Sequence, residues 1–190
     1  MKPTKTNSVN RPMLIGIIGK KQSGKDTFAR FLRAIDGDYE VKKFAGKLKE
    51  VASVLTGYPM WAWEDEEYKN RQLGSTFNNW SLRELLQYLG TEIFRNNLNN
   101  DIWVNLLFDS YSQGDKWIIT DVRFPNELKA IQDRGGIIIK MERKTTDSLD
   151  THISEAFSEK FEYDYVVKND GQEEELFDKA KFILEDEKAK

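Results

Sequence analysis

Residues Gly19, Gly24 and Lys25 stand at the spacing of a phosphate-binding loop, within the segment GKKQSGKDT. A short apolar run over 13–18 precedes the loop, and a helical pattern over 26–35 follows it. That order matters, because such a loop binds phosphate only where a strand ends and a helix begins. Glycines let backbone N–H groups turn toward an anion, and the helix N-terminus adds partial positive charge. The segment therefore predicts a site for nucleotide phosphates, with Lys25 bridging the β- and γ-phosphates.

One position departs from the usual loop pattern, which places Ser or Thr directly after the lysine to reach Mg²⁺. Asp26 occupies that position here, and Thr27 follows it. Either the carboxylate of Asp26 binds the metal, as a hard oxygen ligand does, or the hydroxyl of Thr27 binds it one position later. The sequence leaves both open. The alternative to the whole motif is a glycine-rich turn that carries a surface lysine.

The segment IITDVRFPNE, residues 118–127, is a second place where reactive side chains gather. Ligands of doubly wound sheets collect at the carboxyl ends of the strands, which is where Asp121 would project. A carboxylate there can hold Mg²⁺ or orient an acceptor oxygen, and the planar fork of Arg123 suits phosphate. Glu127 follows one helical turn later. The competing interpretation is that Asp121 caps the next helix and Arg123 forms a surface ion pair.

Arg143 follows an apolar strand pattern and begins a polar loop. An arginine at that position is typical of a lid that closes over transferring phosphates. A solvated arginine explains the pattern equally well.

The elements that must position these residues alternate between strand and helix patterns. This alternation predicts an α/β fold, with a central parallel sheet and helices on both faces. Residues 56–80 break the pattern, and their aromatic and turn-forming residues indicate an irregular, partly mobile insertion. The expected strands are 13–19, 39–44, 117–120, 136–141 and 163–167, and the expected helices are 26–35, 46–55, 81–96, 101–111, 125–134, 153–160 and 172–185.

The composition excludes several classes of protein. The 190 residues include no cysteine and one histidine, so disulfides and thiolate metal sites are absent and a zinc site is not expected. No apolar run is long enough to span a bilayer, so we expect a cytoplasmic protein without a membrane partner. The first fifty residues carry twelve Lys and Arg against five Asp and Glu, although the net charge of the chain is −3. Such a basic region suits small anionic substrates, whereas a nucleic-acid polymer usually needs an overall basic domain.

Six motifs occur in order along the chain, namely GKKQSGKDT, FAGKLK, LRELLQYLGTEIFR, IWV, TDVRFPNE and VVKNDG. Together they resemble the deoxynucleoside monophosphate kinases of tailed bacteriophages, over most of residues 13–184. The resemblance implies a P-loop nucleoside monophosphate kinase-like fold, similar to adenylate kinase. After a flexible tail over 1–12, a single domain over 13–190 would contain a helical monophosphate-binding insertion (56–111) and a lid (143–160).

The resemblance also implies the reaction, which is transfer of the γ-phosphoryl group of ATP to a deoxynucleoside 5′-monophosphate, with Mg²⁺ as cofactor. The products are the diphosphate and ADP. The residues implied for ATP are Gly19, Gln22, Ser23, Gly24, Lys25, Asp26, Thr27 and Asn169, with the metal at Asp26 or Thr27 and the turn at Asn169 beside adenine. Those implied for the monophosphate are Lys21, Gly90, Thr91, Trp103, Asp121, Arg123 and Glu127, and those implied for catalysis are Lys25, Asp121 and Arg143.

Members of that family are often dimeric, so the resemblance adds a homodimer to the expectations, in the host cytoplasm if the chain is phage-encoded. Two alternatives stay open. The first is another small-molecule P-loop kinase, of the dephospho-coenzyme A or phosphomevalonate kinase type. The second is a nucleotide-binding ATPase that has no phosphate acceptor.

Overall fold

A computed structural model of the chain describes residues 12–112, 114–144 and 161–190. The chain forms two compact units, of which the first combines Met1–Lys42 with Ser112–Lys190 and the second is Lys43–Tyr111. The predicted insertion over 56–111 falls within the second unit. The predicted tail before Pro12, the predicted helix 153–160 and nearly all of the predicted lid lie outside the described residues. Among the described helices, none has the length and apolar character needed to span a membrane.

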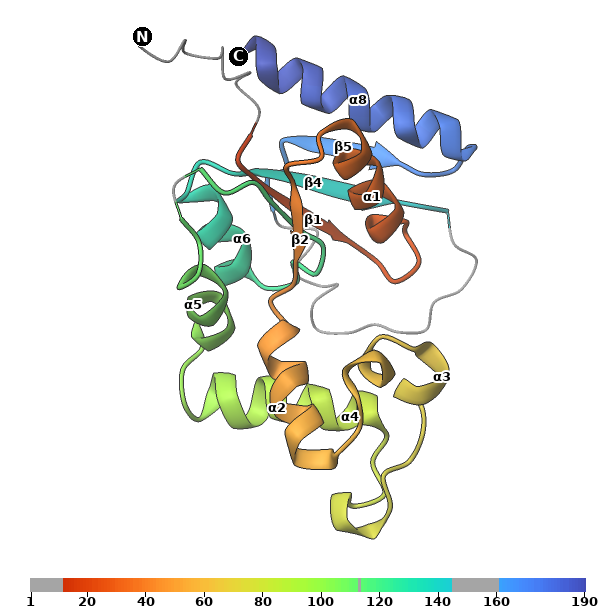
Figure 1. Cartoon of the computed structure of the whole chain (residues 1–190), viewed down its shortest axis with the longest axis vertical. Coiled ribbons are helices and arrows are strands. Elements are labelled where there is room, and N and C mark those ends of the chain that lie inside the picture. Colours follow the sequence, from red (N-terminus) through yellow and green to blue (C-terminus); the bar gives the residue numbers. More distant parts are fainter. Residues whose placement is uncertain (1–11, 113, 145–160) are drawn as a thin grey trace, which may run out of the picture. The chain divides into compact units, whose positions relative to one another are not determined.

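A parallel five-stranded sheet forms the centre of the first unit, in the order β2-β3-β1-β4-β5 (Figure 1). The middle strand β1 pairs with β3 on one side and with β4 on the other, so that Ile15 lies between Ile118 and Ile137. All four pairings are parallel, and the carboxyl ends of the strands therefore meet at one edge of the sheet. The predicted sheet is confirmed, with strands β1 (Leu14–Gly19), β2 (Glu40–Lys42), β3 (Trp117–Ile119), β4 (Ile137–Glu142) and β5 (Tyr165–Lys168).

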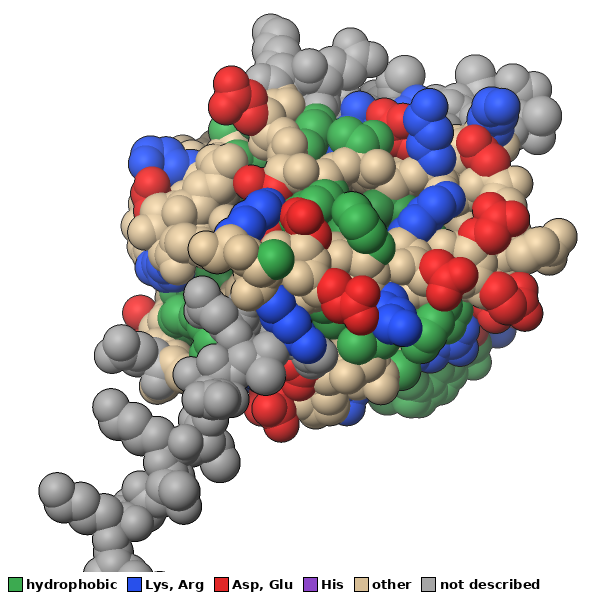
Figure 2. Space-filling view, turned by 90° about the horizontal axis from the view of Figure 1, so that it is seen from above, with side chains coloured by type: hydrophobic (Ala, Val, Ile, Leu, Met, Phe, Trp, Pro, Cys, Tyr) green, Lys and Arg blue, Asp and Glu red, His purple; other side chains and the backbone are tan. Residues whose placement is uncertain are grey.

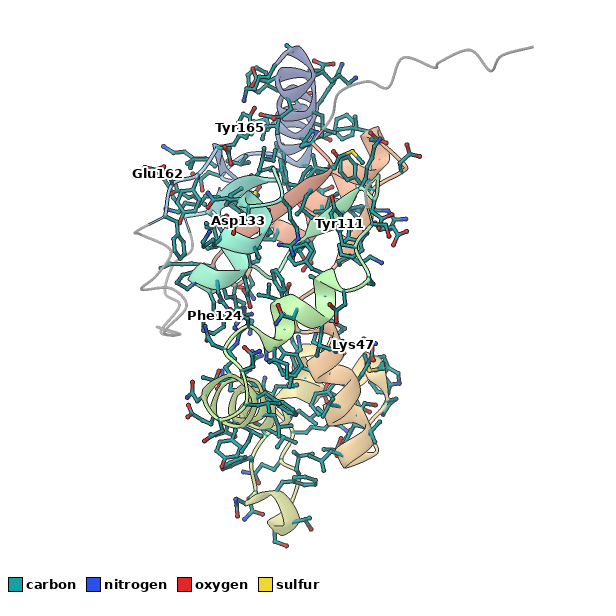
Figure 3. The ribbon with its side chains drawn as sticks, turned by 90° about the vertical axis from the view of Figure 1, so that its left-hand side faces the viewer. Lys47, Tyr111, Phe124, Asp133, Glu162 and Tyr165 are labelled. Atoms are coloured by element: carbon teal, nitrogen blue, oxygen red, sulfur yellow. The ribbon has the colours of Figure 1, made fainter. Side chains whose placement is uncertain are left out.

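Helices cover both faces of this sheet, as predicted. Helices α1 (Lys25–Ile35) and α8 (Glu173–Ala189) share a buried core with Ile15 and Ile17. Helix α6 (Pro125–Gln132) packs on the opposite face, between Phe124 and Asp133 (Figure 3). Acidic, basic and apolar side chains are interspersed on the outer face that carries α8 (Figure 2).

The second unit is helical, and several of its segments pack on one small core. Its buried residues Ala52, Trp63 and Leu82 come from different segments of the chain. The unit consists of α2 (Gly46–Thr56), the 3-10 turn η1 (Met60–Trp63), α3 (Glu66–Lys69), the 3-10 turn η2 (Ser75–Phe77), α4 (Leu82–Gln87), the π-helix η3 (Tyr88–Asn96) and α5 (Ile102–Phe108).

The segment 56–80 contains three short helical turns joined by irregular stretches, within the insertion predicted there. It packs on the core of the second unit, where Trp63 is fully buried. Trp80 contacts Tyr88 edge to face at 4.7 Å between ring centroids, and its carbonyl accepts the N–H of Leu73 at 2.8 Å. Large aromatic side chains hold this segment in place because burying their rings contributes much of the stability of a small core.

The predicted helix over 81–96 begins as expected and then changes type. Ser81 and Glu84 form a capping box, and hydrogen bonds from the backbone and hydroxyl of Ser81 hold the pKa of Glu84 below its ordinary value. From Tyr88 onward the helix is a π-helix. A π-helix widens each turn by one residue, and it occurs frequently at functional sites.

Gly16 on β1 tests how closely the central strand packs against α6 and β4. A Cβ at Gly16 would lie 2.7 Å from Cδ1 of Ile131 and 2.8 Å from Cδ1 of Ile138. Overpacking of this kind costs about 1–3 kcal/mol, so Gly16→Ala should lower the free energy of unfolding by that amount in urea denaturation. Gly37→Ala is the matched control, because a Cβ at Gly37 meets nothing within 4 Å. Equal stabilities of the two variants would contradict the close contact between β1 and α6.

Candidate nucleotide-binding site

The loop between β1 and α1 turns sharply at Gly24, which has φ 96° and ψ 15°. This left-handed conformation favours glycine, and a Cβ at Gly24 would also overlap the side-chain amide nitrogen of Asn169. Gln22 adopts a positive φ of 63° in the same loop. Two left-handed residues therefore let the chain leave the sheet and enter a helix directly.

The turn leaves backbone donors without acceptors. The N–H of Ser23 donates to the carbonyl of Lys20 at 3.2 Å, and the N–H of Phe28 donates to Gly24 at 2.9 Å. Over residues 12–112, 114–144 and 161–190, no acceptor faces the N–H groups of Gly24, Asp26 and Thr27. Unpaired donors at a helix N-terminus, together with the helix dipole, are a ready site for an anion.

The side chain of Lys25 bonds back to the loop, and its role in bridging phosphates stays a prediction. Its ammonium group donates to the carbonyls of Gly19 and Lys20, at 2.7 Å each. Lys21 and Gln22 are exposed at the tip of the loop. The two neutral acceptors of Lys25 are weaker than a charged phosphate oxygen, which can replace them.

Ser23 faces the interior of the loop. Its side chain is 1% exposed, and its hydroxyl oxygen has no hydrogen-bond partner in the described part of the chain. A Cβ on Gly19 would lie 2.7 Å from that oxygen and 2.6 Å from the carbonyl oxygen of Met141. Gly19 is therefore needed for close packing between the loop and β4.

Residues from the ends of β4 and β5 complete the site. Arg143, just after β4, donates from Nη1 to the carbonyl of Gln22 at 3.4 Å. Asn169, just after β5, donates from Nδ2 to the carbonyl of Ser23 at 3.0 Å. The structure therefore brings both of these predicted residues into contact with the phosphate-binding loop.

The segment after β3 leads to the same edge of the sheet, because β3 and β1 are parallel neighbours. Asp121 is half-buried there, and Arg123 is exposed. Glu127 is only 2% exposed, and its Oε2 accepts the backbone N–H of Arg123 at 2.7 Å and that of Phe124 at 3.1 Å. This pairing caps α6 and fixes the backbone at Arg123.

Gly90, Thr91 and Trp103 belong to the second unit. Trp103 is 3% exposed, and its indole N–H donates to the carbonyl of Gly90 at 3.1 Å. A Cβ on Gly90 would lie 2.8 Å from Cδ2 of Leu48. Gly90 and Trp103 thus brace the π-helix, Thr91 is half-buried, and contact of the three with a monophosphate stays a prediction.

Oxygen donors for a metal are present at the start of α1, where Asp26 is exposed and Thr27 is half-buried. The described residues contain no cluster of three His, Asp or Glu side chains that could hold a metal on their own. Mg²⁺ does not need one at a nucleotide site, since phosphates and water supply most of its six oxygen ligands. A carboxylate or hydroxyl beside a phosphate loop therefore fits this ion.

The model of the family described as deoxynucleotide monophosphate kinase matches residues 60–180. Similar proteins are the deoxynucleotide monophosphate kinases of Escherichia phage RB69 (32% identical over 139 residues, 70% of this chain and 57% of that one) and Enterobacteria phage T4 (39% over 110 residues, 55% and 46%). A putative deoxynucleotide monophosphate kinase of Acanthamoeba polyphaga mimivirus is 32% identical over 185 residues, 87% of this chain and 92% of that one. The chain spans about half the length of the two phage relatives that it matches.

The fold resembles that of TT1252 from Thermus thermophilus, with a TM-score of 0.51 and 16% identity over 93% of this chain and 98% of that one. The family model matches residues 60–180 and does not include the loop at 19–27. The geometry of that loop is therefore evidence independent of the family match. The matched residues, and the likeness to the mimivirus protein over most of both chains, agree with the motifs of the sequence. The chain belongs to the deoxynucleotide monophosphate kinase family.

Proposed function

We propose that the chain transfers the γ-phosphoryl group of ATP to a deoxynucleoside 5′-monophosphate, giving the diphosphate and ADP. The observation that carries this proposal is the set of open N–H groups at Gly24, Asp26 and Thr27, with the ammonium of Lys25 beside them. Family membership supports a monophosphate as the acceptor. The expected partners are these small nucleotides, and the expected setting is the host cytoplasm, as a monomer or homodimer.

On the donor side, the loop amides bind the phosphates of ATP while Lys25 leaves the carbonyls of Gly19 and Lys20 to bridge the β- and γ-phosphates. This exchange is favourable because a hydrogen bond to a charged oxygen is about twice as strong as one to a neutral carbonyl. Asp26 or Thr27 would hold Mg²⁺, which when bound neutralises charge on the phosphates. Arg143 contributes a second cation from the end of β4.

On the acceptor side, Lys21 and Arg123 bind the phosphate of the monophosphate, and Asp121 orients its attacking oxygen. Glu127 acts through the backbone of Arg123, whose N–H it accepts. The monophosphate pocket within the second unit is shaped by Gly90, Thr91 and Trp103. Gly90 and Trp103 contribute by supporting the π-helix. Phosphoryl transfer needs little covalent help beyond two phosphates held in line and a site closed to water.

A coupled assay of ADP release tests the proposed acceptor. We expect each active deoxynucleoside monophosphate to stimulate ADP release, tested as a panel of all four with their ribonucleotide counterparts, dephospho-coenzyme A and phosphomevalonate. Release of ADP that no monophosphate stimulates would contradict the proposal and favour an ATPase without an acceptor. Stimulation only by dephospho-coenzyme A or phosphomevalonate would favour another small-molecule kinase.

Lys25→Ala should lower kcat by roughly a hundredfold or more, because the variant loses a cation that stabilises charge in the transition state. Its melting temperature should stay close to that of the unchanged protein, since the two loop carbonyls to which Lys25 donates are exposed or half-buried. Lys181→Ala, on the exposed side of α8, is the matched control. Near-normal turnover of Lys25→Ala would refute its role.

Arg123→Ala should raise the KM for the monophosphate by about tenfold, because a charge-assisted hydrogen bond to phosphate is lost. The KM for ATP should not change, which separates the two nucleotide sites. Arg33→Ala serves as the control, because Arg33 is exposed on α1. A KM for the monophosphate that stays constant in Arg123→Ala would remove this residue from the acceptor site.

A further inference from the structure

Asn169 connects the end of β5 to the phosphate-binding loop through its backbone and its side chain. Its N–H donates to the carbonyl of Glu142 at 2.7 Å, which continues the pairing between β4 and β5. Its side-chain amide donates to the carbonyl of Ser23 at 3.0 Å, although the two residues are 146 positions apart. The sheet therefore fixes where this amide lies, and the amide in turn fixes one carbonyl of the loop.

The hydrogen bond to Ser23 sets the direction of the next N–H. The peptide between Ser23 and Gly24 is trans, like every peptide bond described. In a planar trans peptide the C=O and the N–H point in opposite directions. Because Asn169 holds the carbonyl of Ser23 on its own side, the N–H of Gly24 faces the other way. That N–H has no acceptor within the described residues.

The amide of Asn169 also lies against Gly24 itself. A Cβ on Gly24 would overlap its nitrogen and would lie 3.3 Å from its Cγ. Asn169 is half-buried in this position. The side chain thus fills the space beside the left-handed residue on which the turn depends, and it bonds to the peptide that precedes it.

We propose that Asn169 is a positioning residue for the phosphate-binding loop. It aims the N–H of Gly24 at the bound phosphates, and it acts through the loop and not through contact with adenine, which is the role implied by the family resemblance. This inference rests on the proposed binding of a triphosphate at the loop. It does not depend on the identity of the acceptor.

The two roles differ in which ligands they affect. A residue that positions the loop changes the affinity for any triphosphate, whereas a residue that contacts adenine changes the affinity for ATP alone. Isothermal titration calorimetry should therefore compare ATP with inorganic triphosphate, both with magnesium. The proteins are the unchanged chain, Asn169→Ala, Asn169→Leu and the control Asn105→Ala, whose side chain is exposed on α5. Asn169→Leu keeps the size and neutrality of the side chain and removes its donor.

We expect Asn169→Ala and Asn169→Leu to bind ATP and inorganic triphosphate about fivefold more weakly, by the same factor for both ligands, as the loss of one hydrogen bond predicts. Asn105→Ala should bind both as the unchanged chain does. Weaker binding of ATP alone would overturn the proposal in favour of an adenine contact. Unchanged binding of both ligands, with or without a lower melting temperature, would overturn it in favour of a purely structural role.

A thermal-denaturation cycle tests the contact without any nucleotide. Gly24→Ala should lower the melting temperature more in the unchanged chain than in Asn169→Ala, because the second background lacks the amide that the new methyl group would meet. Additive losses would overturn the contact. If the ligand affinities behave as expected and no monophosphate stimulates ADP release, the acceptor proposed above is wrong and the role of Asn169 stands.

Discussion

The left-handed turn at Gly24 is the constraint on which the rest of the site depends. It lets the chain pass from the buried central strand β1 into the N-terminus of α1, and it leaves backbone N–H groups of the loop without acceptors among the described residues. Because β1 is parallel to both of its neighbours, the ends of β3 and β4 reach the same edge of the sheet. Asp121 and Arg143 follow those ends. One backbone conformation and one sheet topology thus account for the gathering of charged groups around the loop.

We expect the cations of the site to exchange their carbonyl acceptors for phosphate oxygens when a nucleotide binds. In this structure the ammonium of Lys25 donates to two carbonyls, and the guanidinium of Arg143 donates to one. Neutral hydrogen bonds contribute about 1 kcal/mol each, and charge-assisted ones contribute more. Phosphate oxygens therefore compete well for these cations.

Local patterns in the sequence are sufficient to predict most helices and strands and the phosphate-binding loop. The strand, loop and helix around Gly24 follow from the spacing of glycine, lysine and apolar residues within a stretch of fifteen. The helix cap formed by Ser81 and Glu84 follows from a four-residue pattern that begins with serine and ends with glutamate. Contacts between distant residues were not predictable in this way. Neither the burial of Trp103 against Gly90 nor the bond from Asn169 to Ser23 leaves a local signal, because tertiary packing decides both. The same holds for the change to a π-helix at Tyr88 and for the packing of residues 56–80.

The central claim is that the amides at the start of α1 bind the phosphates of a nucleotide. Titration of ¹⁵N-labelled protein with ATP and magnesium, followed by the backbone amide resonances in two-dimensional NMR, tests it most directly. The account predicts that the amide protons of Gly24, Asp26 and Thr27 shift downfield together and saturate at one affinity, as donors that gain a charged acceptor do. Saturable binding of ATP that leaves these three resonances in place would contradict it.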